Sequence, residues 1–462
     1  MKFTKFGKAL LMSALSVGVV LSVSSCVQSY TVGYLYVTGT VTSQSGGNGI
    51  ISGFRIDHNT GKLTAIDGLP ISSGGANPGR AVLITGSRFL YVLNRGVTAS
   101  GSLNCTTANP CQNSNIEQFA IGGNGILTPQ ETFYTQGINP FRILSDSSGT
   151  YLYVLDHDSP APNGLPSSAA NPNPACAQAL GITGGCGDIT AFSINQSTGR
   201  LSPLQNDQVT SANCPNSQAT CPLTYFPVPP NPIDFLFTNS YFLTLSGTPS
   251  TGDSVFPYSY GQSTGQLTVS QNTSQPLNIA QATAIVAGGG YVYVLDDEPI
   301  TIPAGTTGSF TAGTYPSQIL PFSVGTGGAL QAQTGGIVPD DATLSNPIYL
   351  LVESKGRFLY VVNQGNNTNT TNAQSGIAAY VIDTSTHQLS FMAHEPFGSG
   401  AGPQCMIEDP SDQFAYEADA YDSSIYGRVV DPNAGQLNNL TVGNTFSLEG
   451  PAAWCLVDGR TN

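Results

Sequence analysis

The chain has 462 residues, with 14 Lys and Arg against 28 Asp and Glu, and a formal net charge of −14. Proteins that bind nucleic acid neutralise phosphates with Lys and Arg, so this balance excludes nucleic acid as a partner. Charged residues make up 9% of the chain, far below the roughly 25% of an average globular domain. Uncharged polar residues must therefore keep the surface soluble.

Three lysines near the N-terminus precede an apolar run over 9–23. The run is too short to span a membrane and is typical of a secretory signal. It ends in Val23-Ser-Ser-Cys26, which resembles the lipobox of bacterial lipoproteins. The resemblance implies a signal peptide over 1–25, a lipid on the Cys26 thiol and a tether over 26–33. The alternative is an ordinary signal peptide with an incidental cysteine.

From these features we expect an exported lipoprotein of the cell envelope. It would lie in the outer membrane, on its periplasmic side or at the cell surface. The membrane would be a partner only through the lipid on Cys26.

A short motif of aromatic and apolar residues recurs seven times along the rest of the chain. Its short run of aromatic and apolar residues, which ends in Asn or Asp in most copies, is typical of a β-strand. The copies are Tyr34-Leu-Tyr-Val37, Phe89-Leu-Tyr-Val-Leu-Asn94, Tyr151-Leu-Tyr-Val-Leu-Asp156, Tyr241-Phe-Leu-Thr-Leu245, Tyr291-Val-Tyr-Val-Leu-Asp296, Phe358-Leu-Tyr-Val-Val-Asn363 and Phe414-Ala-Tyr416. Seven copies predict a repeat protein.

A second motif follows each copy and consists of another alternating run, a tight turn and a leucine that opens a further short run. The turns read Thr60-Gly-Lys-Leu63, Asn124-Gly-Ile-Leu127, Thr198-Gly-Arg-Leu201, Thr264-Gly-Gln-Leu267, Gly327-Gly-Ala-Leu330, Thr386-His-Gln-Leu389 and Ala434-Gly-Gln-Leu437. Gly, or a residue in its place, between two alternating runs predicts a β-hairpin.

Before most copies of the first motif another run begins at a proline, in the pairs Asn77-Pro78, Asn139-Pro140, Asn231-Pro232, Asn346-Pro347 and Gly402-Pro403. Each unit then contains four antiparallel strands, which we name a to d in chain order. Repetition of such units predicts an all-β, seven-bladed β-propeller over 34–462.

The first unit lacks strand a, whereas the segment 450–462 is a strand a with nothing after it. We therefore expect blade 1 to combine 34–76 with 450–462. The C-terminal strand would then close the ring and leave no exposed sheet edge.

Nine cysteines in an exported chain leave eight after Cys26, an even number that suits disulfides. The pairs that are near neighbours in loops are Cys105 with Cys111, Cys176 with Cys186 and Cys214 with Cys221. By elimination Cys405 pairs with Cys455 and closes a loop of about 50 residues, for which the chain-entropy model gives roughly 4 kcal/mol. A metal–thiolate site is the alternative. No Cys-x-x-Cys occurs and no histidine has ligand spacing, so we expect no metal.

The blade scheme assigns every loop to one face of the ring. The a–b turns, such as Ser148-Gly149 and Lys355-Gly356, and the c–d turns are short and share what we call the short-turn face. The b–c loops and d–a connections surround the other end of the channel, which we call the loop-rich mouth. The long segments there are 96–115, 157–188, 298–318, 364–376 and 205–230. Long loops on a rigid scaffold commonly bind ligands, so we place the site at the loop-rich mouth.

The ends of strands a and b bring a dense group of charged side chains to this mouth. Such a group suits hydrolysis of a carbonyl compound, which needs an activated water and a donor or cation for the carbonyl oxygen. His157 with Asp156 or Asp158 is the candidate base, and Arg142 or Arg95 is the candidate oxyanion partner. The candidate substrate-binding residues are Arg80, Arg95, Asp158, Asp234, Asp296, Asp297 and Asn363.

Each of these residues has a structural alternative. Asp or Asn after a strand often caps a turn, and His157 fits equally as a solvated loop residue. The run Asp296-Asp297-Glu298 offers calcium ligands, but its spacing is not that of a dedicated calcium loop.

The Tyr-Val strands, the Thr-Gly-x-Leu turns and the seven units resemble the lactonase-type propellers, the 6-phosphogluconolactonase-like or YVTN-repeat proteins, over 34–462. The resemblance implies a hydrolase of a small lactone or sugar-derived ester. The family's Gly-Pro-Arg-His and Asn-Glu segments are not preserved. The matching positions read Asn231-Pro-Ile-Asp234, Gly402-Pro-Gln-Cys405, Leu245-Ser-Gly247 and Val362-Asn-Gln364.

Neither a Gly-rich phosphate loop nor a haem attachment motif occurs, so we expect no cofactor. The expected partner is a small lactone or a carbohydrate, and we expect a monomer. The alternative function is a non-catalytic scaffold of the cell envelope that holds a glycan or a protein at the same mouth.

Overall fold

The computed structural model describes residues 30–41, 48–84, 88–211, 220–238, 240–247, 252–270, 277–305, 310–333, 337–366 and 374–459. The predicted signal peptide over 1–25, Cys26 and Cys214 lie outside these residues. Over the ranges described, no helix has the length and hydropathy needed to cross a lipid bilayer.

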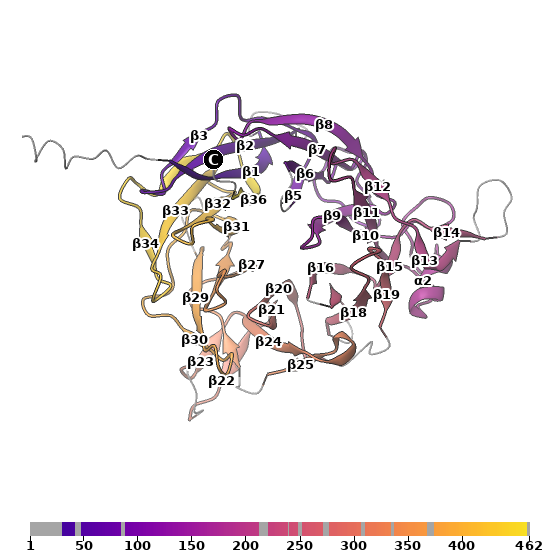
Figure 1. Cartoon of the computed structure of the whole chain (residues 1–462). Coiled ribbons are helices and arrows are strands. Elements are labelled where there is room, and N and C mark those ends of the chain that lie inside the picture. Colours follow the sequence, from indigo (N-terminus) through magenta and orange to yellow (C-terminus); the bar gives the residue numbers. More distant parts are fainter. Residues whose placement is uncertain are drawn as a thin grey trace, which may run out of the picture.

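Seven antiparallel sheets stand around a central axis, which confirms the predicted all-β, seven-bladed propeller (Figure 1). From the axis outward, the first four blades are β36 (Ala452–Asp458), β1 (Thr31–Thr40), β2 (Asn48–Asp57) and β3 (Leu63–Ala65); β5 (Pro78–Leu83), β6 (Phe89–Asn94), β7 (Asn115–Ile121) and β8 (Leu127–Phe133); β9 (Ile138–Ser145), β10 (Tyr151–Asp158), β11 (Gly187–Ile194) and β12 (Leu201–Pro203); and β16 (Pro232–Phe237), β17 (Tyr241–Ser246), β18 (Ser254–Tyr260) and β19 (Leu267–Val269).

The remaining three blades follow the same order. They are β20 (Ala282–Gly288), β21 (Tyr291–Asp296), β24 (Gln318–Val324) and β25 (Leu330–Ala332); β27 (Pro347–Val352), β28 (Phe358–Asn363), β29 (Gly376–Ile382) and β30 (Leu389–Phe391); and β31 (Pro403–Glu408), β32 (Phe414–Asp419), β33 (Ser424–Val430) and β34 (Leu437–Asn439). The core lies between neighbouring blades, where apolar side chains of both sheets interlock.

The ring closes as predicted, because the C-terminal strand β36 pairs antiparallel with β1 in blade 1. The strand β1 begins at Thr31, three residues before the expected start at Tyr34. A disulfide joins Cys405 of β31 to Cys455 of β36, so the first and last blades are also linked covalently.

The repeated tyrosine and the repeated glycine turn form one interaction between neighbouring blades. In five blades the tyrosine hydroxyl of strand b donates to the carbonyl of the glycine in the next blade's c–d turn. The pairs are Tyr36 with Gly125 (2.7 Å), Tyr153 with Gly265 (2.9 Å), Tyr360 with Gly435 (2.6 Å), Tyr416 with Gly61 (2.7 Å) and Tyr91 with Gly199. The two sequence motifs therefore recur together because each needs the other.

The sixth blade departs from this rule. His387 takes the place of the turn glycine and adopts a left-handed conformation with φ of 56°. The Tyr293 hydroxyl, which faces this turn from blade 5, is buried without a hydrogen-bond partner.

The long loops contain elements that the sequence patterns did not indicate. Four blades carry a further short strand paired with strand c, namely β4 (Ile71–Ala76), β15 (Phe226–Val228), β26 (Val338–Pro339) and β35 (Thr445–Ser447). Two hairpins and two short helices complete the fold: β13 (Asn206–Ser211) with β14 (Cys221–Leu223), β22 (Ile300–Ile302) with β23 (Gly313–Tyr315), α2 (Pro174–Leu180) and η2 (Thr326–Gly328). Figure 1 shows α2 and β13–β14 outside the ring beside blade 3.

Two of the three loop disulfides are fully visible in the structure, between Cys105 and Cys111 and between Cys176 and Cys186. Cys221 is also disulfide-bonded, and its predicted partner Cys214 lies outside the described residues. These bonds fasten loops around blades 2 and 3.

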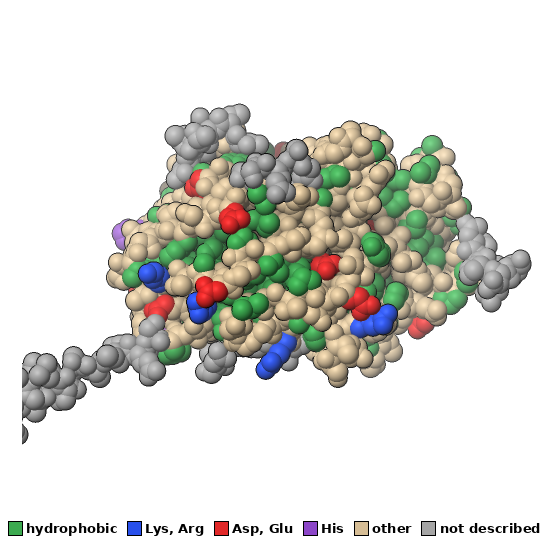
Figure 2. All heavy atoms as spheres, turned by 90° about the horizontal axis from the view of Figure 1, so that it is seen from above, with side chains coloured by type: hydrophobic (Ala, Val, Ile, Leu, Met, Phe, Trp, Pro, Cys, Tyr) green, Lys and Arg blue, Asp and Glu red, His purple; other side chains and the backbone are tan. Residues whose placement is uncertain are grey.

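The outer surface is poor in charge, as the composition predicts. Figure 2 shows Lys, Arg, Asp and Glu scattered singly among uncharged atoms on one side of the ring. The acidic side chains that concern the candidate site are mostly inside the blades.

Candidate functional site

The innermost strand of every blade is irregular at the same place, close to its first residue. A β-bulge interrupts the pairing of strands a and b in all seven blades. Bulges re-aim side chains and are frequent near functional sites. In blades 1 to 7, the residues at this level are Trp454, Arg80, Arg142, Asp234, Ala284, Tyr349 and Cys405.

Side chains of blades that are not direct neighbours touch one another at this level. Arg80 of blade 2 makes a bidentate ion pair with Asp234 of blade 4, with both N···O distances at 2.9 Å. The Trp454 indole of blade 1 meets the Tyr349 ring of blade 6 edge-on, with centroids 5.3 Å apart. Arg80 also lies over the Trp454 indole, 4.6 Å from its centroid. These four side chains therefore reach into the central channel.

Arg142 of blade 3 joins this ion pair. Its Nε lies 3.4 Å from the Asp234 carboxylate, and 25% of its side chain is exposed against 2% for Asp234. Burial and the guanidiniums of Arg80 and Arg95 lower the pKa of Arg142 to about 9, while Asp234 opposes the shift. Burial also lowers the pKa of Arg95. With a pKa of about 9, the Arg142 guanidinium keeps its charge at neutral pH.

We call Arg80, Arg95, Arg142 and Asp234 the arginine cluster. It opposes three positive charges to one negative charge, in a chain whose formal net charge is −14. Such a local surplus attracts anions and stabilises negative charge that develops during a reaction.

His157 lies close to the arginine cluster and pairs with Asp158. Its Nδ1 is 3.3 Å from Asp158 Oδ1, and 37% of the imidazole side chain is exposed. The Asp158 carboxylate also accepts hydrogen bonds from Thr107 Oγ1 at 2.7 Å and Asn139 Nδ2 at 2.9 Å. Because Nδ1 faces the carboxylate, Nε2 is the nitrogen available to accept a proton.

The Phe141 ring connects His157 to the arginine cluster. The centroid of the Phe141 ring lies 6.2 Å from that of the His157 imidazole. The Arg142 guanidinium carbon lies over the same Phe141 ring, 5.1 Å from its centroid. The ring is therefore an apolar surface near both the candidate base and the candidate oxyanion partner.

Asp156 lies apart from this dyad, in the interior of blade 3. It is fully buried and stands directly opposite Asp188 in the pairing of β10 with β11, and the Thr190 hydroxyl donates to it at 3.2 Å. Burial raises the pKa of Asp156 to about 7. Burial and the Asp156 charge raise the pKa of Asp188 well above its usual value. One proton shared between the two carboxyls avoids two buried charges side by side.

The remaining predicted residues belong to blades 5 and 6. Asp296 is fully buried and accepts hydrogen bonds from the backbone N–H of Gln281 at 2.7 Å and from Gln318 Nε2 at 3.1 Å. Asp297 is half-buried, and burial together with Asp296 raises its pKa. Asn363 is fully buried at the end of β28. Asp296 thus holds the loop before strand a by accepting from its backbone. This is the capping role that we named as the structural alternative to substrate binding.

Three aromatic residues of the site were not expected from the sequence: Trp454, Tyr349 and Phe141. Each lies in a strand a, at the bulge or beside it. If the units had been aligned on their prolines, Tyr349 would have fallen at the same strand-a position as the predicted site residues Arg142 and Asp234. Among the residues that the structure describes, no three His, Cys, Asp or Glu are placed to hold a metal ion.

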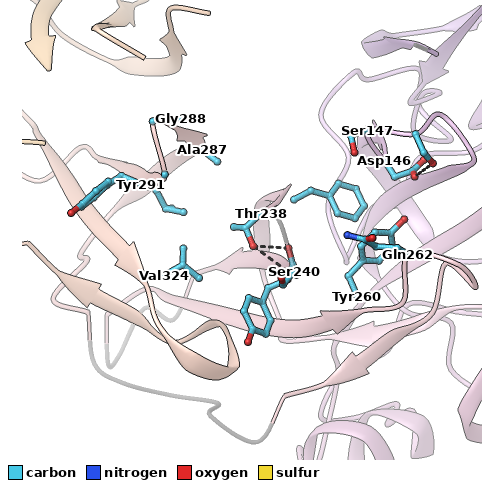
Figure 3. Close-up of a pocket in the computed structure, with 16 residues that line it drawn as sticks. Asp146, Ser147, Thr238, Ser240, Tyr260, Gln262, Ala287, Gly288, Tyr291 and Val324 are labelled. Carbon is cyan, nitrogen blue, oxygen red and sulfur yellow. Dashed lines mark hydrogen bonds between the residues drawn. The ribbon is translucent and has the colours of Figure 1, made fainter. Parts of the chain in front are cut away.

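Two cavities lie away from the predicted residues. One of about 820 Å³ opens on the short-turn face, bounded by the a–b turns of blades 3 to 5 (Figure 3). The other, of about 470 Å³, lies between the β13–β14 hairpin and the loop that contains α2. Neither cavity is lined by a predicted site residue.

Comparison with solved structures finds the same fold in several bacterial proteins. A putative 6-phosphogluconolactonase from Bacteroides uniformis is similar with a TM-score of 0.61 at 13% identity, over 92% of this chain and 99% of that one. The periplasmic gluconolactonase of Pseudomonas aeruginosa gives a TM-score of 0.58 at 15% identity, over 92% of this chain and 99% of that one. At such low identity these similarities show the fold alone.

Comparison with curated proteins finds no match. The family model described as lactonase, seven-bladed β-propeller, matches residues 34–161 and 309–453, which is more than half of the chain. With the seven blades and their closure, this match settles the family: the chain belongs to the lactonase family of seven-bladed β-propellers.

Proposed function

We propose that the chain is an exported, lipid-anchored hydrolase that opens a small lactone or sugar-derived ester at the loop-rich mouth. The proposal rests on the arginine cluster and the His157–Asp158 pair, because the Phe141 ring is near both Arg142 and His157. Membership of the lactonase family supports the reaction class. The apolar run over 9–23 and the lipobox-like Val23-Ser-Ser-Cys26 support export and the anchor.

In this mechanism Arg142 and His157 act on the two sides of the lactone carbonyl. Arg142 donates to the carbonyl oxygen and stabilises the charge that forms there. His157 Nε2 takes a proton from the attacking water, and Asp158 stabilises the resulting imidazolium. The ring C–O bond then breaks, and its oxygen takes the proton from His157. The product is a hydroxy acid, whose carboxylate Arg80 and Arg95 attract.

Hydrolysis in a pH-stat, with a panel of sugar and aliphatic lactones, tests the proposal on protein that lacks the predicted signal peptide. We expect His157→Ala and Arg142→Ala each to lower kcat by about 100-fold or more without lowering the Tm. Arg200→Ala is the control, because this arginine is 68% exposed in a surface ion pair. Turnover that survives both channel substitutions would place the reaction elsewhere.

A non-catalytic scaffold is the second candidate, and one observation favours it. The Arg80–Asp234 and Trp454–Tyr349 contacts occupy the channel below the mouth. A ligand would then rest on the mouth and be held there, as a glycan or a protein would be. Background rates across the lactone panel, together with binding of a glycan that Arg142→Ala weakens, would favour the scaffold over the hydrolase.

A further inference from the structure

The cavity of about 820 Å³ on the short-turn face lies on the opposite side of the ring from the loop-rich mouth. Figure 3 shows Asp146 and Tyr260 on one side, Tyr291 on the other, and Thr238 with Ser240 between them. Its volume falls within the roughly 300–1,000 Å³ that is usual for small-molecule sites.

The cavity exists because two neighbouring blades have shortened a–b turns. In blades 3, 6 and 7 a backbone hydrogen bond closes this turn between residues five positions apart, in the pairs Asp146 with Tyr151, Glu353 with Phe358 and Asp409 with Phe414. In blade 4, Thr238 bonds to Tyr241, three positions on, and in blade 5 Gly288 pairs with Tyr291 at the same spacing. Two residues are thus absent from the same turn in adjacent repeats, which leaves a hollow between them.

Aromatic rings begin strand b in both blades with a shortened turn, where they are more exposed than in blades 3, 6 and 7. The first residue of strand b is 7% exposed at Tyr151 and 3% exposed at Phe358 and Phe414, under longer turns, whereas Phe89 of blade 2 is half-buried. Its equivalents Tyr241 and Tyr291 are half-buried and line the cavity. The aromatic lining of the cavity therefore comes from residues of the repeat itself, Tyr241 and Tyr291, and not from an inserted loop.

These rings are held in place before any ligand arrives. Tyr291 stacks on His387, with centroids 4.2 Å apart and planes at 28°. The Tyr241 hydroxyl accepts a hydrogen bond from the Gly327 N–H at 2.9 Å. Tyr260 packs edge-on against Phe237 at 4.9 Å. Rigid aromatic surfaces lose little entropy on binding, so a ligand gains most of the contact energy.

The lining carries almost no charge. Asp146 is its one charged residue, and the Asp146 carboxylate already accepts from the backbone N–H groups of Thr150 and Tyr151 at 2.8 Å each and from the Ser148 hydroxyl. Hydroxyl and amide groups such as those of Ser147 and Gln262 make up much of the remaining polar lining. Aromatic faces combined with neutral donors and acceptors suit a ligand with apolar C–H faces and many hydroxyls.

We propose that this cavity binds a neutral saccharide of about disaccharide size. The sugar rings stack on Tyr291 and Tyr260, and the hydroxyls bond to Ser147, Ser240 and Gln262. The lining residues that the structure describes include no cation to attract an anion, so this site would differ from the arginine cluster in its preference for neutral ligands. The saccharide site stands independently of the proposed hydrolase.

Isothermal titration of the full protein with glucose, maltose, cellobiose and lactose tests the site, with glucuronate as the charged comparison. We expect at least one neutral sugar to bind and glucuronate to bind at least tenfold more weakly. Tyr291→Ala should weaken the neutral sugar about tenfold, because stacking is lost, while Tyr291→Phe keeps the ring and stays within about twofold. Ser147→Trp fills the cavity from an exposed position and should abolish binding, with Ser147→Ala as its matched control.

Tyr134→Ala serves as the control for removal of a tyrosine, because Tyr134 is 63% exposed away from the cavity. The proposal is overturned if none of the four sugars binds the unaltered protein. Binding that persists in Ser147→Trp would overturn it as well, because the sugar would then occupy another surface.

Discussion

The phenol of Tyr416 donates a hydrogen bond to the carbonyl of Gly61 at 2.7 Å, across 355 residues of sequence. Tyr416 belongs to the last blade and Gly61 to the first, so this bond crosses the seam of the ring. It is the same interaction that four other blades form with their immediate successors. The seam is therefore built like those four junctions, with the addition of a disulfide.

Tyr416→Phe should lower the free energy of unfolding by about 1–2 kcal/mol, because it leaves the buried Gly61 carbonyl without a donor. Tyr293→Phe is the matched control, since the Tyr293 hydroxyl has no partner to lose. We expect that second change to be neutral or slightly stabilising. Urea unfolding of the two variants measures the difference, and equal losses would contradict the assigned role of the hydroxyl.

The seam disulfide should matter more than a loop disulfide. Cys405 and Cys455 are 50 residues apart, whereas Cys105 and Cys111 are 6 apart. Since the unfolded chain loses more entropy in the longer loop, the Cys405→Ala/Cys455→Ala double variant should lose about 4 kcal/mol and the Cys105→Ala/Cys111→Ala variant roughly half of that. Chemical unfolding without reductant gives both values. A larger loss in the loop variant would show that strain or packing outweighs loop length.

The ion pair between Arg80 and Asp234 provides a third prediction. Asp234→Asn removes the carboxylate that pairs with the guanidiniums of Arg80 and Arg142, so it should lower the free energy of unfolding by about 3 kcal/mol. Adding Arg80→Met to this variant should restore part of the loss, because one uncompensated charge is removed. Glu131→Gln, in the exposed pair with Arg200, should cost less than about 1 kcal/mol. Additive effects of the two channel substitutions would argue against the coupling.

The buried carboxyl pair of Asp156 and Asp188 predicts that stability falls as pH rises. Both pKa values are higher in the folded protein than in the unfolded chain, so the folded state binds more protons between them. The stabilisation is complete below about pH 4, near the unfolded pKa, and is lost through about pH 7, the folded pKa of Asp156.

Thermal unfolding between pH 4 and pH 8 measures this effect. Asp188→Asn removes one of the two charges, so its Tm should exceed that of the unaltered protein at about pH 8 and approach it near about pH 4. Asp67→Asn, at an exposed position, should leave the pH profile unchanged. A Tm that rises steadily over this range would contradict the assignment.

The lipid anchor is tested by Cys26→Ser. We expect the unaltered protein to fractionate with membranes and the variant to be released, because the thiol that would carry the lipid is gone. Intact-mass measurement of the membrane-bound form checks for the added acyl groups. An unmodified Cys26 in exported protein would favour the ordinary signal peptide.

Most of the architecture could be predicted because each blade repeats local patterns. The strands, the c–d turns and the closure by 450–462 all follow from residues that are close in sequence or visibly duplicated. The contacts that define the channel could not be predicted in the same way. Arg80 and Asp234 meet through the curvature of the ring, and no local pattern encodes which blades face each other.

In the candidate site too, the residue types could be predicted from local sequence, but their contacts could not. Asp158 and Asp156 look equivalent beside His157 in the sequence. Asp156 is the last residue of β10 paired with β11 and stands opposite Asp188, whereas Asp158 lies beyond that pairing and accepts from Thr107. The shortened turns at Thr238 and Gly288 are visible in the sequence as missing residues. The cavity that these missing residues leave forms only because the two repeats are adjacent in the ring.

The lipid anchor that we propose would direct any pull from the membrane to the seam of the ring. The chain enters the propeller through β1, which lies between β36 and β2 rather than at a sheet edge. Tension along the tether would therefore have to shear two ladders of hydrogen bonds at once instead of peeling one strand away. Through the Cys405–Cys455 bond, blade 7 would share that tension with blade 1. A propeller held by the proposed N-terminal anchor would thus bear the load at the junction of its first and last blades. A β-ladder and a disulfide join the two ends of the chain there.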